Sequence, residues 1–436
     1  MSTSSGNTRL FSDSESMNSV QLSLNQPSRG AYGIVWKAVS RKTNQVVAVK
    51  KCFDAFQNST DAQRTFREIM YLQALSGHEN IIQILNVLKA ENDKDIYIVT
   101  DFMESDLHAV VKAGILQDIH KQYIIYQILR ALKFMHSGDL IHRDIKPSNI
   151  LLNSDCAIKM CDFGLARSVN CKSPTSGVVM TDYVATRWYR APEILLGSPN
   201  YTKGVDVWAV GCILGELIIG KPVFAGNSTL DQIERIIQAT GKPSSSEVSS
   251  IKSVFAGTML ESITTPVYKR NNFLQEMFPR ASRDMIDFLS RCLQFSPEKR
   301  WSVNDLLKHS LMAPFHDEST EPVCLKPPIE IPLDDNVKLT ASDYRSRLYD
   351  GVIRRKKEIN REAANRGAVE KNPAPPPKAV PKPDPPSPVT YATAHQRTSY
   401  RPSSTVVKEE QAASSNATSS ATESFFSYLF GGGRWL

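Results

Sequence analysis

Three short polar segments in a fixed order constrain this chain of 436 residues more than any other feature. Residues 142–149 read HRDIKPSN, residues 162–164 read DFG, and residues 191–193 read APE. The first two segments bring carboxylates, an amide and a lysine close together in sequence, with Asp162 thirteen positions after Asn149. Ordinary loop residues reach this order and spacing very rarely, so we interpret these residues as the centre of a catalytic site.

The three segments resemble the signature of the protein kinases. The resemblance implies an α+β bilobal kinase fold, with a small β-rich N-lobe, a large α-helical C-lobe and ATP between them. Phosphoryl transfer needs a carboxylate near the attacking hydroxyl, oxygen ligands for Mg²⁺ and a cation on the phosphates. We therefore expect Asp144 to be the catalytic base, Lys146 the cation on the transferred phosphate, and Asn149 and Asp162 the Mg²⁺ ligands.

Upstream segments are expected to complete the ATP site. The apolar run 46–50 ends in Lys50, which can reach the α- and β-phosphates and pair with Glu68 on a predicted helix. The pattern G-x-G-x-x-G falls on residues 28–33, where Ser28 replaces the first glycine, so we expect weaker ATP binding and an active enzyme. The expected ATP-binding residues are Gly30, Ala31, Tyr32, Gly33, Val35, Ala48, Lys50, Glu68, Thr100, Asp101 and Met103.

Hydrophobic periodicity separates the lobes. Alternating or β-branched runs predict strands at residues 20–24, 33–39, 45–51, 81–88 and 95–102, and helical spacing predicts a helix at 61–75. Helical periodicity dominates from residue 107 to 315. We expect a disordered N-terminus at 1–17 and a kinase domain at 18–316, divided into an N-lobe at 18–103 and a C-lobe at 104–316. The resemblance also implies that Asp206 braces the catalytic loop and that Glu193 pairs with Arg300.

The composition changes after residue 316. From residue 338 onward the sequence has 16 basic and 9 acidic residues, against 36 of each before it, so the tail carries the whole net charge of +7. We expect a C-terminal extension at 317–366 and a disordered Pro/Ser-rich tail at 367–436, which cannot bury enough apolar surface to offset the entropy of ordering. A solvated linker explains the basic charge, so we expect no nucleic-acid binding.

The seven cysteines form no C-x-x-C pair, and the first residues are polar, which predicts reduced thiols in an intracellular, cytoplasmic protein without a signal peptide. The most apolar stretch, 205–219, is short and contains Asp206 and Glu216, so we expect a core helix and no transmembrane segment. We also expect a monomer. Cys161 precedes the DFG segment, as in kinases with a thiol near the nucleotide, although a buried, inert cysteine is an equal alternative.

Residues 181–183 read TDY and resemble the dual-phosphorylation lip of the mitogen-activated protein kinases. The segments 53–64 and 106–110 resemble the autoactivating branch called mitogen-activated protein kinase fifteen. This resemblance implies a proline-directed serine/threonine kinase that autophosphorylates Thr181 and Tyr183, uses Ser/Thr-Pro substrates, and acts in cilium and autophagy regulation, at the cilium, basal body or cytoskeleton and in the nucleus. The arginines expected to bind the lip phosphates are Arg67, Arg143, Arg167, Arg187 and Arg190.

Two peptide-binding sites are also expected. Asp317, Glu318 and Glu321 lie where mitogen-activated kinases carry an acidic groove for basic docking peptides, although a plain acidic cluster fits equally well. Tyr349 and Val352 have the aromatic-x-x-aliphatic form that adds a strand to autophagy ubiquitin-like modifiers, and residues 426–429 offer a second such motif. The competing interpretation is that Tyr349 packs a helix onto the kinase lobe.

Two other functions remain open. A catalytically poor scaffold could use the kinase fold to present its tail. A cyclin-dependent kinase is the other alternative, because residues 220–224 (GKPVF) also occur in such sequences. Against the second alternative, the helix that carries Glu68 lacks a cyclin-reading motif, and Tyr183 has no role there.

Overall fold

The computed structural model describes residues 33–41, 43–169, 186–199, 202–263, 273–333, 338–354 and 361, and the backbone of 20–22 and 28–30. Described residues up to Asp350 belong to one compact unit. The N-terminus at 1–17, the lip at 181–183 and the tail from 367, including the motif at 426–429, lie outside the described residues.

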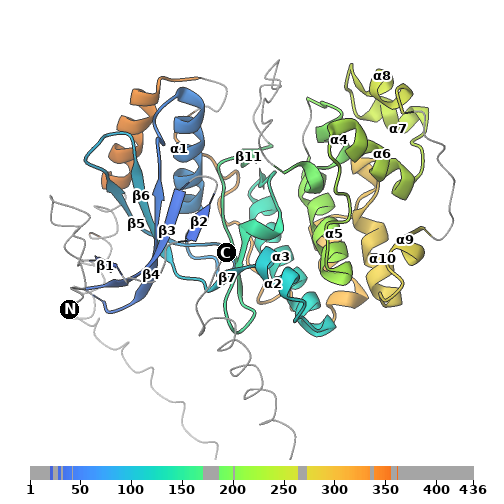
Figure 1. Cartoon of the computed structure of the whole chain (residues 1–436), viewed down its shortest axis with the longest axis horizontal. Helices are drawn as coiled ribbons and strands as arrows, with labels where there is room; N and C mark the ends of the chain where they lie inside the picture. The colour runs from blue at the N-terminus through green and yellow to red at the C-terminus, as the bar shows by residue number, and fades with distance from the viewer. Residues whose placement is uncertain are drawn as a thin grey trace, which may run out of the picture. The chain divides into compact units, whose positions relative to one another are not determined.

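The N-terminal lobe is an antiparallel sheet covered by one long helix, as Figure 1 shows. The strand order is β1-β3-β4-β6-β5, and β2 pairs with β3. The helix α1 begins two residues earlier than predicted because the Asn58 side chain accepts hydrogen bonds from the Thr60 and Asp61 amides. The bounds are β1 Val20–Leu22, β2 Ser28–Gly30, β3 Gly33–Ser40, β4 Val46–Cys52, α1 Ser59–Ala74, β5 Ile84–Lys89 and β6 Ile96–Asp101.

The C-terminal lobe packs its helices around α5 (Gly204–Ile219), which the sequence predicted as a core helix. Most of α5 is buried, including Trp208, and it contacts α3 and α10. The other helices are α2 Leu107–Ala113, α3 Asp118–Ser137, α4 Pro192–Leu195, α6 Thr229–Thr240, α7 Ser245–Ser250, α8 Ala256–Glu261, α9 Phe273–Met277, α10 Arg283–Cys292 and α11 Val303–Leu307. Among the described helices, none is long and apolar enough to cross a membrane.

Five short strands lie in the C-terminal lobe near the polar segments 142–149 and 162–164. They are β7 Ser105–Asp106, β8 Leu140–Ile141, β9 Ile150–Leu152, β10 Ile158–Met160 and β11 Arg167–Ser168. The strand β9 pairs with β10, and β11 pairs with β8. The predicted strand at 81–88 starts later than expected, at Ile84, because Ile81 forms an isolated bridge with Met160 instead.

Residues 341–354 form a further helix. Its first turn is capped reciprocally: the Asp343 amide donates to Thr340 Oγ1, and the Thr340 amide donates to Asp343 Oδ2. The bilobal α+β architecture confirms the predicted fold class.

Candidate active site

The hairpin of β9 and β10 explains the spacing of the first two polar segments. Met160 pairs with Ile150, so the residues just outside the hairpin, Asn149 and Cys161, are brought side by side. The Cys161 amide donates to the Asn149 carbonyl at 3.0 Å. Asn149 and Asp162 therefore lie at the same end of the hairpin, as expected for two ligands of one ion.

The Asp144 carboxylate is held from two directions. Lys146 Nζ lies 2.7 Å from Asp144 Oδ2. Asn149 Nδ2 donates to the Asp144 carbonyl at 2.8 Å and to its Oδ2 at 3.2 Å. Burial raises the pKa of Asp144, while Lys146 opposes that shift. A carboxylate with a raised pKa is a better proton acceptor than a fully solvated one, which suits a general base.

Asp206 on α5 holds the backbone of the loop that carries Asp144, here called the catalytic loop (residues 142–149). Asp206 Oδ2 accepts from the His142 amide and Oδ1 from the Arg143 amide, each at 2.9 Å, and His136 Nε2 lies 2.9 Å from Oδ2. Burial raises the pKa of Asp206, but His136 and the backbone donors outweigh it and lower the pKa overall. Arg143 has φ +71°, and these bonds hold that left-handed conformation in place. The expected brace is present.

Phe163 anchors the second segment in the core. Its side chain is fully buried, and its ring centroid lies 4.7 Å from that of His142. Asp162 has φ +65°, so the chain turns sharply between the buried Phe163 and the hairpin. The Asp162 carboxylate and Asn149 Oδ1 are the two side-chain oxygen donors that the β9–β10 hairpin brings to one end.

Those two oxygen donors fit Mg²⁺. Magnesium is usually held by one or two protein oxygen ligands together with substrate phosphates and water. The described residues contain no cluster of three or more His, Cys, Asp or Glu that could enclose a metal alone. Asn149 and Asp162 are thus suited to an ion that arrives with phosphates.

Lys50 and Glu68 form the expected ion pair between sheet and helix. Lys50 Nζ on β4 lies 2.9 Å from Glu68 Oε1 on α1. Burial lowers the pKa of Lys50, but Glu68 and other nearby acidic groups raise it more, so its pKa lies well above the ordinary value. Lys50 is therefore a fixed positive charge at the site.

A cavity of about 590 Å³ joins these groups. Lys50, Glu68, Asp144 and Asp162 all line it, together with Gly33. A Cβ on Gly33 would lie 1.9 Å from the Lys51 carbonyl oxygen, so close approach of β3 and β4 requires glycine there. The cavity is thus lined by the residues that were predicted to act on phosphates.

Several other residues expected to bind ATP do not line this cavity, namely Val35, Ala48, Thr100, Asp101 and Met103. Ala48 on β4 is paired with Thr100 on β6, and Val35 on β3 is paired with Lys50. Met103 packs against the main core. The Asp101 carboxylate lies 3.1 Å from Lys159 Nζ, so its side chain already has a partner. Gly30 ends β2, and Ala31 and Tyr32 lie outside the described residues.

The arginines predicted to bind lip phosphates come from four parts of the chain. Arg67 is buried on α1, and Arg143 Nη1 donates to the Leu165 carbonyl. Arg167 Nη1 on β11 donates to the Ala166 carbonyl, and Arg187 Nη1 donates to that of Asn227. Arg143 and Arg190 line a small pocket together with Asp144. The structure thus places Arg143 and Arg190 around one pocket with Asp144, the expected catalytic base, while Thr181 and Tyr183 lie outside the described residues.

The expected pair of Glu193 and Arg300 is buried and bidentate, with two distances of 2.7 Å. Sequence reasoning missed another buried contact nearby, in which Tyr189 Oη donates to Glu216 Oε2 at 2.5 Å. Burial raises the pKa of Glu216. The sequence signal for this contact was Glu216, an acidic residue inside an apolar helix. Its partner Tyr189 lies 27 positions earlier, so no local pattern connects the two.

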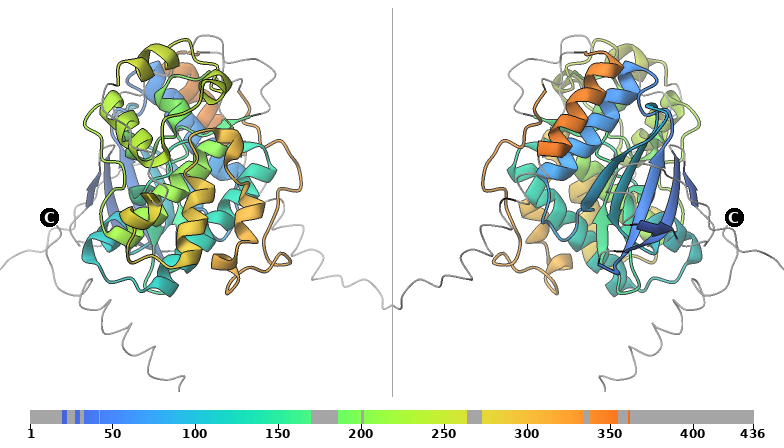
Figure 2. Two further views of the ribbon diagram at one scale, coloured as in Figure 1. Left: turned by 90° about the vertical axis from the view of Figure 1, so that its right-hand side faces the viewer. Right: turned by 90° about the vertical axis from the view of Figure 1, so that its left-hand side faces the viewer.

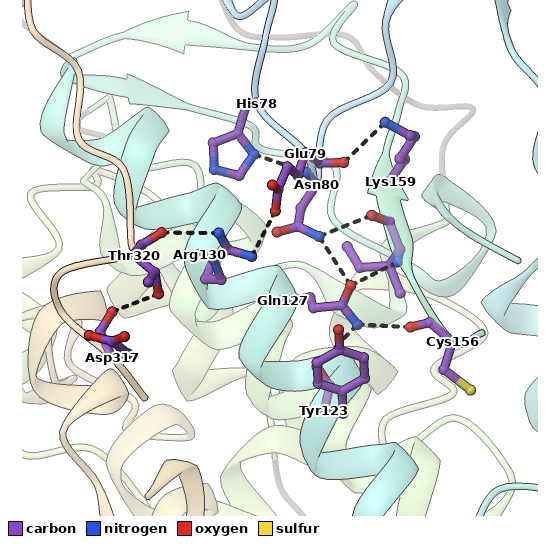
Figure 3. Close-up of polar contacts among 11 residues, drawn as sticks. His78, Glu79, Asn80, Tyr123, Gln127, Arg130, Cys156, Lys159, Asp317 and Thr320 are labelled. Atoms are coloured by element: carbon purple, nitrogen blue, oxygen red, sulfur yellow. Dashed lines mark hydrogen bonds and ion pairs between the residues drawn. The ribbon is translucent and has the colours of Figure 1, made fainter. Parts of the chain in front are cut away.

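The acidic docking prediction needs a correction at Glu321. Its side chain is fully buried between Lys133 Nζ, at 2.9 Å, and His316 Nδ1, at 2.7 Å, so it is not available to a peptide. Asp317 and Glu318 are exposed. Figure 3 shows Asp317 beside Thr320, whose carbonyl accepts a hydrogen bond from Arg130, while Arg130 also pairs with Glu79.

The modifier-binding prediction is wrong for Tyr349 and Val352. Binding by strand addition needs an extended, accessible peptide, whereas both residues lie in the helix 341–354. Val352 is buried, and the Tyr349 ring centroid lies 6.3 Å from that of Phe56. The competing interpretation, in which Tyr349 packs a helix onto the lobe, is correct.

Comparisons with known proteins agree with this geometry. Residues 27–312 match the family described as "Protein kinase domain". The chain is 56% identical over 344 residues to "Extracellular signal-regulated kinase 2" of Dictyostelium discoideum, covering 78% of this chain and 92% of that protein. It is 48% identical to "Mitogen-activated protein kinase 15" of Caenorhabditis elegans, covering 76% and 71%, and 48% identical to the protein of that name from Xenopus laevis, covering 85% and 65%.

Proposed function

Because the chain belongs to the protein kinase family and, within it, to the mitogen-activated protein kinases, we propose that it transfers phosphate from ATP to serine or threonine followed by proline, with Asp144 as catalytic base. The observation that carries this proposal is the position of Asp144 between Lys146 and Asn149, in one cavity with Lys50 and Asp162.

The residues divide the chemistry among them. Asp144 accepts the proton of the substrate hydroxyl as that oxygen attacks the γ-phosphorus of ATP, the bond from this phosphorus to the β-phosphate oxygen breaks, and ADP leaves. Lys146 stabilises the charge that develops on the transferred phosphate. Lys50, oriented by Glu68, positions the other phosphates. Asn149 and Asp162 would hold Mg²⁺, which supplies charge neutralisation to the phosphate oxygens when bound.

Proline direction is proposed to depend on Arg187. In the structure, Arg187 donates to the Asn227 carbonyl. A phosphate on Tyr183 would be a stronger acceptor and would turn the side chain away. If no backbone carbonyl then faces the residue after the acceptor, an N–H group at that position would be left without a partner, and proline, which has no N–H, would be favoured.

Activation by autophosphorylation of Thr181 and Tyr183 is part of the same proposal, and it is supported by the TDY sequence and by the arginines around the catalytic loop. Asp317 and Glu318 are proposed to contact basic docking peptides because they are exposed and acidic. The resemblance to the kinase-fifteen branch supports a signalling role in cilium and autophagy regulation.

A paired peptide assay tests the proposed specificity. Two basic peptides that differ only in Ser-Pro against Ser-Ala are incubated with the enzyme, Mg²⁺ and ATP, and Asp144→Asn serves as the matched control. We expect at least about a tenfold higher kcat/KM for Ser-Pro, equivalent to about 1.4 kcal/mol, and no transfer by the control. Equal rates on both peptides would refute proline direction, and transfer by Asp144→Asn would refute the role of the base.

A further inference from the structure

A second lysine of the N-lobe sheet lies on the same face as Lys50. Lys50 lines the cavity, and its direct partner on β3 is Val35. Directly paired side chains of neighbouring strands share one face, and side chains alternate along each strand. Lys37, two positions after Val35 on β3, is therefore on the cavity face as well. Figure 2 (right) shows the strands of this sheet (shades of blue) side by side.

Lys37 belongs to a row of three paired residues on this face. It pairs with Ala48 on β4, and Ala48 pairs with Thr100 on β6. Ala48 and Thr100 are both expected to bind ATP. Lys37 is thus the β3 end of a row whose other two members were predicted to belong to the nucleotide site.

The segment after β6 brings an aromatic ring back to the same end of the row. Asp101 directs its carboxylate to Lys159 Nζ, at 3.1 Å. The next side chain, that of Phe102, meets Lys37 instead, whose Nζ lies 4.6 Å from the ring centroid. A contact between β3 and the segment that follows β6 therefore closes this end of the row.

The contact suits a nucleobase better than a phosphate. Small-molecule sites are lined mainly by apolar and aromatic side chains, and the half-buried Phe102 ring is such a surface. A cation over an aromatic face is attracted by the ring quadrupole. A ring that is already fixed in this way loses less conformational freedom when a ligand binds.

We propose that Lys37 is a positioning residue for the adenine base of ATP, because its ammonium group holds the Phe102 ring at the edge of the base. This inference rests on the ATP use proposed above. The competing role for a lysine is direct attraction of the phosphates. Lys50 lines the cavity predicted to hold the phosphates, whereas Lys37 and Phe102 do not.

Calorimetric titration with adenosine and with inorganic tripolyphosphate separates the two roles in full-length protein. Lys37→Met removes the charge and should raise the Kd of adenosine by about three- to fivefold. The KM for ATP should rise by about the same factor with kcat unchanged, because uniform binding is lost. The Kd of tripolyphosphate should stay within about 1.5-fold of wild type.

Two variants control for charge and for side-chain length. Lys37→Arg keeps a cation over the ring, so its Kd for adenosine should stay within about 1.5-fold of wild type. Lys89→Met removes the same charge from an exposed ion pair with Asp93 in the same lobe and should also stay within about 1.5-fold. In a Phe102→Leu background, Lys37→Met should cost less than about 1.5-fold, because the ring is already absent.

An adenosine Kd within about twofold of wild type in Lys37→Met, or the full loss in the Phe102→Leu background, would overturn the proposal. An equal loss of tripolyphosphate affinity would overturn it too, because it would assign Lys37 to the phosphates. If adenosine binds wild type and Lys37→Met equally well, only the positioning role fails. If folded wild type binds neither adenosine nor ATP, the proposed function fails together with it.

Discussion

Replacing Asp206 with Asn tests the brace beneath the catalytic loop. The carboxylate of Asp206 receives two backbone N–H groups and faces His136 Nε2. An asparagine has one acceptor oxygen, so its NH₂ group must face at least one backbone donor. If the asparagine oxygen continues to accept the hydrogen bond from the Arg143 amide, the buried His142 amide is left without an acceptor.

The cost can be worked out from these contacts. A hydrogen bond to a charged group contributes about 1.5–3 kcal/mol, and an unsatisfied buried donor costs about 1–3 kcal/mol. Because His136 can change tautomer and accept from the new NH₂, only the backbone contact is lost outright. We therefore expect Asp206→Asn to lower the free energy of unfolding by about 2–4 kcal/mol.

Urea unfolding followed by tryptophan fluorescence measures this change, since Trp208 lies two positions after Asp206. The matched control is Asp118→Asn, which removes the same charge from an exposed ion pair with Lys121 and should cost less than about 1 kcal/mol. A loss below about 1 kcal/mol for Asp206→Asn would refute the reasoning.

The pH dependence follows from the lowered pKa of Asp206. A carboxyl whose folded pKa is lowered contributes stability above its unfolded pKa of about 3.9, and that contribution is lost as the pH falls through the folded value. The difference between wild type and Asp206→Asn should therefore stay constant from about pH 8 to pH 5 and shrink below about pH 4. A difference that grows on acidification would contradict the assignment.

Three further predictions concern the cavity and its surroundings. Glu68→Gln should lower kcat/KM by about 100-fold, because Lys50 loses the partner that orients it; ADP release measures this, and wild-type turnover would contradict it. Thr100→Met should weaken ATP-site inhibitors that carry a bulky aryl group, measured as Kd, whereas equal affinity would show that residue 100 does not limit the pocket. Burial raises the pKa of the Cys161 thiol, so iodoacetamide at pH 8 should label Cys161 far more slowly than a free cysteine. Mass spectrometry measures the extent of labelling, and equally fast labelling of the two thiols would contradict this prediction.

The sequence predicted the centre of the site well because its signals are local. The residues that flank the β9–β10 hairpin meet through backbone pairing alone, so the spacing between Asn149 and Asp162 already implied their proximity. Lys50 and Glu68 lie only 18 positions apart, on a strand and a helix whose periodicity is clear. Five N-lobe strands (β1, β3, β4, β5 and β6) and α1 were predicted to within three residues for the same reason, whereas β2 and the short strands β7 to β11 were not predicted.

Long-range partners were not predictable in this way. Glu321 was expected to be an exposed docking acid, but Lys133, which pairs with it, lies 188 positions earlier in the chain. Tyr349 fits a linear binding motif, whereas its burial depends on Phe56 and on the helical form of its segment. In both cases tertiary packing determines exposure, and no local pattern carries that information.

Phosphopeptide mapping of the purified chain after incubation with Mg²⁺ and ATP tests most directly whether Asp144 drives phosphoryl transfer in this protein. Wild type and Asp144→Asn are expressed in bacteria, treated identically and compared by mass spectrometry. We predict phosphate on Thr181 and Tyr183 in wild type and on neither residue in Asp144→Asn. Equal phosphorylation of the two proteins, or unmodified Thr181 and Tyr183 in folded, ATP-supplied wild type, would contradict the account.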